Sequence, residues 1–158
     1  MREVGIASSV LRETRRHVYV LPLEDLAEFP EQLDVGSPRF VLFLAADFSA
    51  TLMDRGALSD RIIDAGCVYF CAWGTGCERM HDIFDDSVVV RELDGGGIGT
   101  IMTTWHDKEP LEEAAKFALV MAEPDDHYAE GCNAVVLATA GDPQWSSRVE
   151  AVARKHVI

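Results

Sequence analysis

Two apolar runs decide the fold: residues 39–46, Arg-Phe-Val-Leu-Phe-Leu-Ala-Ala, and residues 67–72, Cys-Val-Tyr-Phe-Cys-Ala. Neither run alternates apolar with polar residues, which is typical of strands that are buried on both faces of a parallel sheet. Between the runs, Leu58 and Ile62 lie on the apolar face of a predicted helix, and Gly66 is well placed to end it. Strand, helix and strand at this spacing predict a βαβ unit with parallel strands.

Similar elements extend the pattern on both sides of this unit. Strands are expected at residues 17–23 and 133–139, and helices at residues 111–123 and 143–156. Residues 1–16 are polar and weakly patterned, and we interpret them as an N-terminal arm or a short leading helix. The alternation predicts a single three-layer, Rossmann-like α/β domain over residues 1–158, with a mostly parallel central sheet.

One antiparallel hairpin is expected within this sheet. A short helix is predicted at residues 77–84, and residues 88–93 and 98–104 would then pair as strands across a glycine turn at 94–97. The glycines form no dinucleotide-binding fingerprint, because the segment at 74–76 lacks the third glycine. The sequence therefore gives no reason to expect a nucleotide cofactor.

Acidic residues outnumber basic ones by 27 to 14, which gives the 158-residue chain a formal charge of −13. This charge repels phosphate backbones and anionic lipids, so neither nucleic acid nor a membrane surface is an expected partner. It suits solubility or a basic protein partner. The first residues lack the order of a signal peptide, and no apolar run approaches the roughly eighteen residues of a membrane span. We therefore expect a cytoplasmic location, where thiols stay reduced.

Reactive side chains follow the predicted strands directly. Asp47 and the segments 73–81, 105–109 and 141–142 each come after an apolar strand. Ligands of open α/β sheets bind outside the carboxyl ends of the strands, so we expect these four loops to meet at one edge. The side chains expected to surround a pocket there are Asp47, Trp73, Trp105 and Asp107.

A zinc ion is one interpretation of the central loop. Cys77, Glu78 and His81 share one side of a predicted helix start, and His106 follows a later strand. Thiolate and imidazole are preferred zinc ligands, so Cys77, His81 and His106 would bind the ion, with Cys71 as a further ligand. Glu78 would be a ligand, an orienting residue or a general base.

A thiol nucleophile is the second interpretation. The N-terminus of a helix lowers the pKa of a cysteine thiol, a histidine can accept its proton, and Glu78 can orient that histidine. Backbone amides of residues 74–76 would then receive an oxyanion. In this hydrolase-like or transferase-like site, Cys77, Glu78, His81 and His106 would be the catalytic residues.

An acidic, non-enzymatic binding module is the alternative from a different class. In this hypothesis the chain is an immunity or adaptor protein that neutralises a basic partner. Its cysteine and histidine side chains would then be structural. Cys67 and Cys132, which flank or open predicted buried strands, are expected in the core under every interpretation.

The spacing Cys77-Glu78-x-x-His81 with the later His106 resembles the signature of the bacterial CEHH (Cys-Glu-His-His) proteins. Proteins of that family are encoded beside ubiquitin-like conjugation components, in operons associated with antiviral defence. The resemblance covers residues 73–106. It implies a role in bacterial protein modification or defence, with these four residues as the functional set.

Overall fold

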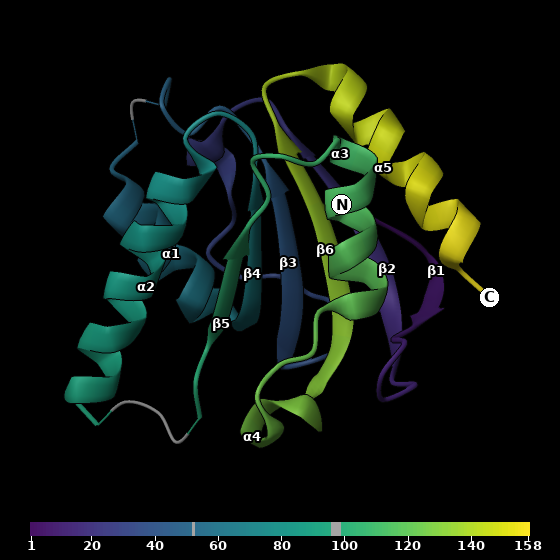
Figure 1. Ribbon diagram of the computed structural model, residues 1–158, viewed down its shortest axis with the longest axis horizontal. Helices are drawn as coiled ribbons and strands as arrows, with labels where there is room; N and C mark the ends of the chain where they lie inside the picture. Colours follow the sequence, from purple (N-terminus) through teal and green to yellow (C-terminus); the bar gives the residue numbers. More distant parts are fainter. Residues whose placement is uncertain (52, 96–98) are drawn as a thin grey trace.

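The described residues form a six-stranded mixed sheet with helices on both faces, an α/β fold (Figure 1). The computed structural model describes residues 1–51, 53–95 and 99–158. The strands are β1 (Arg2–Ser8), β2 (Arg15–Leu23), β3 (Arg39–Ala45), β4 (Cys67–Trp73), β5 (Met102–Trp105) and β6 (Cys132–Ala140). The helices are α1 (Arg55–Ala65), α2 (Cys77–Leu93), α3 (Leu111–Lys116), α4 (Asp126–Ala129) and α5 (Pro143–His156).

The order of the strands across the sheet is β1-β2-β6-β3-β4-β5, and every neighbouring pair except β1–β2 is parallel. The apolar runs of β3, β4 and β6 are buried almost throughout. They lie in the interior of the sheet because helices cover both of their faces. The mostly parallel α/β sheet predicted from these runs is confirmed.

Helices α1 and α2 cover one face of the sheet, and α3 and α5 cover the other (Figure 1). Helix α1 buries Leu58 and Ile62, begins at Asp54, whose carboxylate caps two amides, and ends at Gly66. Gly66 has a φ of 115°, so the left-handed ending expected from the sequence is confirmed. Helix, sheet and helix make the three layers that the alternation predicts.

The N-terminal prediction is wrong: residues 2–8 form a strand instead of an arm or a leading helix. β1 pairs with β2 in an antiparallel arrangement, with Ala7 opposite Arg16. Only one end of this edge strand is buried, so its sequence carries no clear apolar pattern. The antiparallel hairpin of the sheet is therefore formed by β1 and β2.

The hairpin predicted at residues 88–93 and 98–104 is also wrong. Residues 88–93 belong to α2, because Cys77, Met80, Phe84 and Val88 recur at helical spacing and are all buried. β5 begins at Met102 and pairs with β4 in a parallel arrangement. Residues 96–98, part of the predicted turn and strand, lie outside the described residues.

The helix predicted at residues 111–123 is shorter as an α-helix. α3 ends at Lys116 and continues as a π-helical turn over Phe117–Met121. A 3₁₀ turn, Leu26–Glu28, lies between β2 and β3. In the described ranges, no helix combines the length and the apolar character needed to cross a membrane.

Two crevices open at the carboxyl edge of the sheet. β4 and β5 are neighbours, but the helices that follow them, α2 and α3, go to opposite faces. β3 and β6 are also neighbours, and the helices that follow them, α1 and α5, diverge in the same way. In open α/β sheets, such points of divergence are where ligands bind.

Candidate functional site

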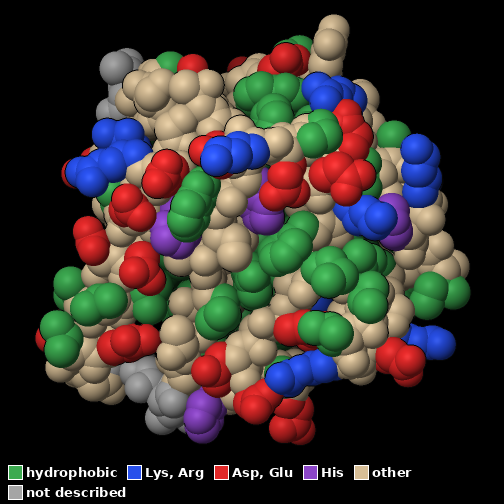
Figure 2. Space-filling model, in the orientation of Figure 1, with side chains coloured by type: hydrophobic (Ala, Val, Ile, Leu, Met, Phe, Trp, Pro, Cys, Tyr) green, Lys and Arg blue, Asp and Glu red, His purple; other side chains and the backbone are tan. Residues whose placement is uncertain are grey.

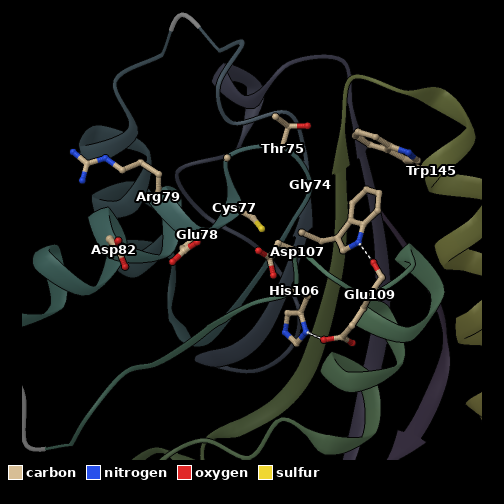
Figure 3. A pocket seen from close by; sticks show the side chains of 12 residues that line it. Gly74, Thr75, Cys77, Glu78, Arg79, Asp82, His106, Asp107, Glu109 and Trp145 are labelled. Atoms are coloured by element: carbon tan, nitrogen blue, oxygen red, sulfur yellow. Dashed lines mark hydrogen bonds and ion pairs between the residues drawn. The ribbon is translucent and has the colours of Figure 1, made fainter.

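A pocket of about 720 Å³ lies at the crevice between β4 and β5. Its walls come from the start of α2, from the loop after β5 and from the first turn of α5 (Figure 3). The lining residues are Trp73, Gly74, Thr75, Gly76, Cys77, Glu78, Arg79, Asp82, His106, Asp107, Glu109 and Trp145. The volume is that of a site for a small molecule or for one protein side chain.

The turn from β4 into α2 requires glycine. Gly74 has a φ of 116°, and a Cβ atom built there would lie 2.0 Å from the backbone oxygen of Ala46. Gly76 is left-handed with a φ of 81°, and its carbonyl accepts the first α2 bond from the Met80 amide. This tight turn sets Cys77 at the first position of α2, on the floor of the pocket.

The Cys77 thiol is almost fully buried, with 1% of the residue exposed. Burial raises the pKa of this thiol, and the nearby Asp107 carboxylate raises it further. Hydrogen bonds from backbone amides, foremost that of His106, lower the pKa without overcoming the effect of burial. The net direction is opposite to the one a nucleophilic cysteine needs.

His106 is buried, and both of its ring nitrogens have protein partners. Nδ1 lies 2.8 Å from Glu109 Oε1, and Nε2 lies 2.9 Å from Thr104 Oγ1. The ring also stacks on Phe117, with 4.9 Å between the centroids. With both nitrogens occupied, His106 does not accept the proton of Cys77 in this arrangement. It fixes the loop that carries Asp107.

The polar contacts of His106 extend through Thr104 to side chains of β4 that do not line the pocket. Thr104 is within hydrogen-bonding reach of Cys71 and Tyr69, and burial raises the pKa of each of these two groups to about 12. Cys71 is fully buried on β4 and does not line the pocket. It therefore belongs to a buried polar chain instead of a ligand set.

Two predicted site residues, His81 and Trp105, contact each other outside the pocket. Their rings stack with centroids 4.6 Å apart, and His81 Nδ1 lies 3.1 Å from Asp82 Oδ1. Asp47 lies in the other crevice, between β3 and β6. The structure thus brings together Cys77, Glu78, His106, Trp73 and Asp107, and it leaves His81, Trp105, Asp47 and Cys71 outside the pocket.

The four expected zinc ligands do not come together: Cys77 and His106 line the pocket, but His81 and Cys71 do not. No three His, Cys, Asp or Glu side chains within residues 1–51, 53–95 and 99–158 come together as ligands for a metal ion. Cys71 is buried, His81 stacks on Trp105, and both nitrogens of His106 are bonded. The donor set that zinc prefers is therefore not assembled in this arrangement of the side chains.

Sequence reasoning missed several wall residues, above all Trp145 and Glu109. Trp145 comes from α5, and its ring meets that of Trp73 edge to face at 5.4 Å. The Trp73 indole N–H also donates to the backbone oxygen of Glu109, at 2.9 Å. No local pattern links Trp145 to β4, but the His-x-x-Glu spacing of His106 and Glu109 was a signal for that pair.

Acidic groups dominate the pocket. Its walls carry four carboxylates, Glu78, Asp82, Asp107 and Glu109, against the single guanidinium of Arg79. Figure 3 shows that the guanidinium points away from Cys77, whereas the carboxylates of Glu78 and Asp107 lie on either side of the Cys77 side chain. The pocket therefore favours a cation over an anion.

The fold and the pocket define an α/β protein with a small, acidic site at the carboxyl edge of its sheet. The family model described as "Domain of unknown function (DUF7684)" matches residues 16–156, and the chain belongs to this family. A comparison with curated proteins finds no match.

Proposed function

We propose that this protein is a cytoplasmic binding protein whose pocket receives a cationic group of its ligand, an ammonium or a guanidinium. One observation carries the proposal: Glu78 and Asp107 flank the pocket from different elements, and the indoles of Trp73 and Trp145 stand beside them. Carboxylates form charge-assisted hydrogen bonds with such cations, and indole faces attract them.

The chemistry of Cys77 supports binding over catalysis. The pKa of its thiol is raised by burial, and His106, the imidazole that lines the same pocket, has both nitrogens engaged. A cysteine nucleophile needs a thiolate and a base, so these contacts argue against the thiol interpretation. The scattered positions of His81 and Cys71 argue against the zinc interpretation.

A binding protein of this kind corresponds to the acidic immunity or adaptor module expected from the composition. It would also suit an accessory of a ubiquitin-like conjugation or defence system, the role that the Cys-Glu-His-His resemblance implies. In both cases, the ligand of the pocket would be a basic group of a partner protein.

The test compares two ligands of the same shape and different charge, butylguanidinium and butylurea. Each ligand is titrated into the protein while NMR follows the resonances of the backbone amides and of the indole N–H groups. Butylguanidinium is expected to bind with a Kd on the order of 1 mM, at about 0.5 kcal/mol per non-hydrogen atom. Butylurea is expected to bind at least about tenfold more weakly, because it cannot form an ion pair.

The affected resonances locate the site. Shifts are expected at the indole N–H groups of Trp73 and Trp145 and at the amides of Glu78 and Asp107. Equal affinities for the two ligands, or shifts confined to other parts of the chain, would overturn the proposal.

A further inference from the structure

We infer that the surface between α2 and the outer edge of β5 binds an extended, basic segment of a partner protein, which adds a strand to the sheet beside β5 and places one basic side chain in the pocket. We call this the α2–β5 surface; it consists of Glu78, His81, Asp85 and Glu92 on α2 and of Trp105 on β5. The inference rests on the proposed function, because the pocket lies at one end of this surface.

β5 is an edge strand. Among the residues that the structure describes, it is last in the order of the sheet and pairs with β4 on one side only. The amide of His106, just beyond β5, points toward β4 and donates to the Ala72 oxygen at 3.0 Å. Because alternate residues of a strand direct their backbone groups to opposite sides, those of Thr103 and Trp105 point away from β4. Such an edge is a template for an added strand.

A large apolar side chain stands exposed on the side of this edge that faces α2. Trp105 is 40% exposed there, whereas Met102 pairs with Tyr69 and lies on the opposite face of the sheet. The Trp105 ring is held in place by stacking on His81. An immobilised indole loses little conformational entropy on binding, which makes it an effective contact for a partner.

The side of α2 that faces β5 carries a line of carboxylates. Glu78, Asp85 and Glu92 recur every seven residues, so they share one side of the helix, and all three are exposed. His81 lies on this side too, and its contact with Trp105 shows that the side faces β5. Figure 2 shows acidic side chains gathered where α2 lies, beside histidine and hydrophobic side chains. This charge is complementary to a basic segment.

The spacing of the carboxylates fits an extended chain. Glu78 and Asp82 lie one helical turn apart, about 6 Å along α2 at 1.5 Å per residue. Alternate residues of a strand lie about 6.6 Å apart on the same face. A partner segment with Lys or Arg at two alternate positions therefore matches Glu78 and Asp82 at the pocket end of α2. β5 spans four residues, which limits the added strand to a similar length.

The carboxyl end of β5 leads the partner segment to the pocket. Glu78 belongs to both the α2–β5 surface and the pocket wall, and Asp107 follows β5 by two residues. A basic side chain at the end of the added strand therefore reaches the carboxylates that flank Cys77. This geometry names the ligand class of the pocket as a lysine or arginine side chain of a polypeptide.

The test uses a fluorescein-labelled peptide with the sequence Lys-Val-Lys-Val-Lys and measures its fluorescence anisotropy with the full chain. Two further peptides carry N-methyl groups on alternate amides, one set on each edge of the extended peptide. In only one of these two peptides do the N-methyl groups remove the backbone N–H donors of the edge that pairs with β5. We expect that version to bind at least about tenfold more weakly, and the other to stay within about twofold.

An electrostatic attraction without strand pairing gives a different result. It would leave both N-methylated peptides equally strong, and this outcome overturns the inference. Equal weakening of both peptides would also overturn it, because no single edge would then be in contact with β5.

A matched pair of variants separates the α2–β5 surface from the pocket. Asp85→Asn removes a carboxylate of α2 that does not line the pocket, and Asp34→Asn removes an exposed carboxylate in the loop before β3. Asp85→Asn is expected to weaken the unmodified peptide about threefold and to leave butylguanidinium binding unchanged. Asp34→Asn is expected to change neither affinity.

The two ligands distinguish the two ways of failing. If butylguanidinium binds and the peptide does not, the inference is overturned and the proposed function stands. If butylguanidinium itself does not bind, the pocket does not receive cations, and the inference falls with the proposed function.

Discussion

The two crevices at the carboxyl edge of the sheet have the same topology, but their pockets differ in volume. Each lies between adjacent parallel strands whose following helices diverge to opposite faces. The crevice between β4 and β5 holds a pocket of about 720 Å³, whereas the pocket between β3 and β6 has about 150 Å³. Topology therefore selects the edge of the sheet where a ligand binds, and local chemistry decides between the two crevices.

At the crevice between β3 and β6, the polar groups of the turn after β3 bond within the turn itself. Oδ1 of Asp47 accepts hydrogen bonds from the amides of Ser49 and Ala50, at 3.0 and 3.2 Å. These bonds lower the pKa of Asp47, with the Ser49 hydroxyl as the largest contributor. The Phe48 side chain is buried, and its amide donates to the Thr75 oxygen at 2.8 Å. The Asp47 carboxylate that follows β3 therefore stabilises its own turn by accepting these hydrogen bonds.

Two of the four carboxylates of the β4–β5 crevice are used differently, whereas Glu109 and Asp82 contact histidine side chains. Among the described residues, the structure gives no hydrogen-bond partner for the carboxylates of Glu78 and Asp107. Both stay exposed on the pocket wall, because the turns beside them are closed by glycine and by backbone bonds instead. An acidic group that its own turn does not need is available for a ligand.

The contact between the crevices gives the largest expected effect. Gly74→Ala would place a Cβ atom 2.0 Å from the Ala46 oxygen at a φ of 116°. Backbone strain and a clash with a rigid carbonyl each cost about 1–3 kcal/mol, so we expect a loss of about 4 kcal/mol in the free energy of unfolding. Urea denaturation measures this loss.

Gly36→Ala is the matched control. Gly36 also has a positive φ, of 64°, but no atom of the other described residues lies within 4 Å of the Cβ position. This change is expected to cost about 1 kcal/mol from the left-handed conformation alone. Equal losses for the two variants would show that the close approach of the two crevices contributes nothing to stability.

The second prediction concerns the reactivity of the Cys77 thiol at the β4–β5 crevice. Burial raises the pKa of Cys77, so its thiolate fraction, and with it the rate of alkylation by iodoacetamide, is expected to rise about tenfold per pH unit. Between pH 7 and pH 8 the rate at Cys77 should therefore grow about tenfold without a plateau. Mass spectrometry of the alkylated peptides measures this profile.

Cys132 is the internal control for that profile. It is fully buried, and burial raises its pKa to about 11, so its alkylation is expected to be slower than that of Cys77 at every pH. A plateau for Cys77 near neutral pH would mean a lowered pKa. That result would restore the nucleophile interpretation and remove the difference in chemistry on which the binding proposal depends.

The elements of the sheet could be predicted where burial leaves a pattern. The apolar runs of β3, β4 and β6 are buried on both faces, and this condition alone produces such runs. β1 lies at the edge and buries mainly Ala7, so no run appears. Residues 88–90 are three valines, whose strand propensity was overridden by the packing of Val88 in the helix.

The site could be predicted only as far as topology determines it. Cys77, Glu78 and Asp107 follow β4 and β5 directly, so their meeting was predictable from the strand order. The direction of the His106 ring depends on Thr104 and Glu109, and the presence of Trp145 depends on how α5 packs. These tertiary contacts have no signature in the spacing of the Cys-Glu-His-His residues.

The smallest expected effect compares one carboxylate from each crevice. Asp107→Asn is expected to weaken butylguanidinium binding about fivefold, because an exposed ion pair contributes up to about 1 kcal/mol. Asp47→Asn makes the same change of charge at the equivalent position after β3, where the carboxylate serves its own turn. It should leave the affinity within about 1.5-fold. Titrations of both variants, followed by the amide resonances, measure the difference. A similar loss of affinity in both variants would mean that butylguanidinium responds to the overall negative charge of the edge and does not distinguish the β4–β5 crevice from the β3–β6 crevice.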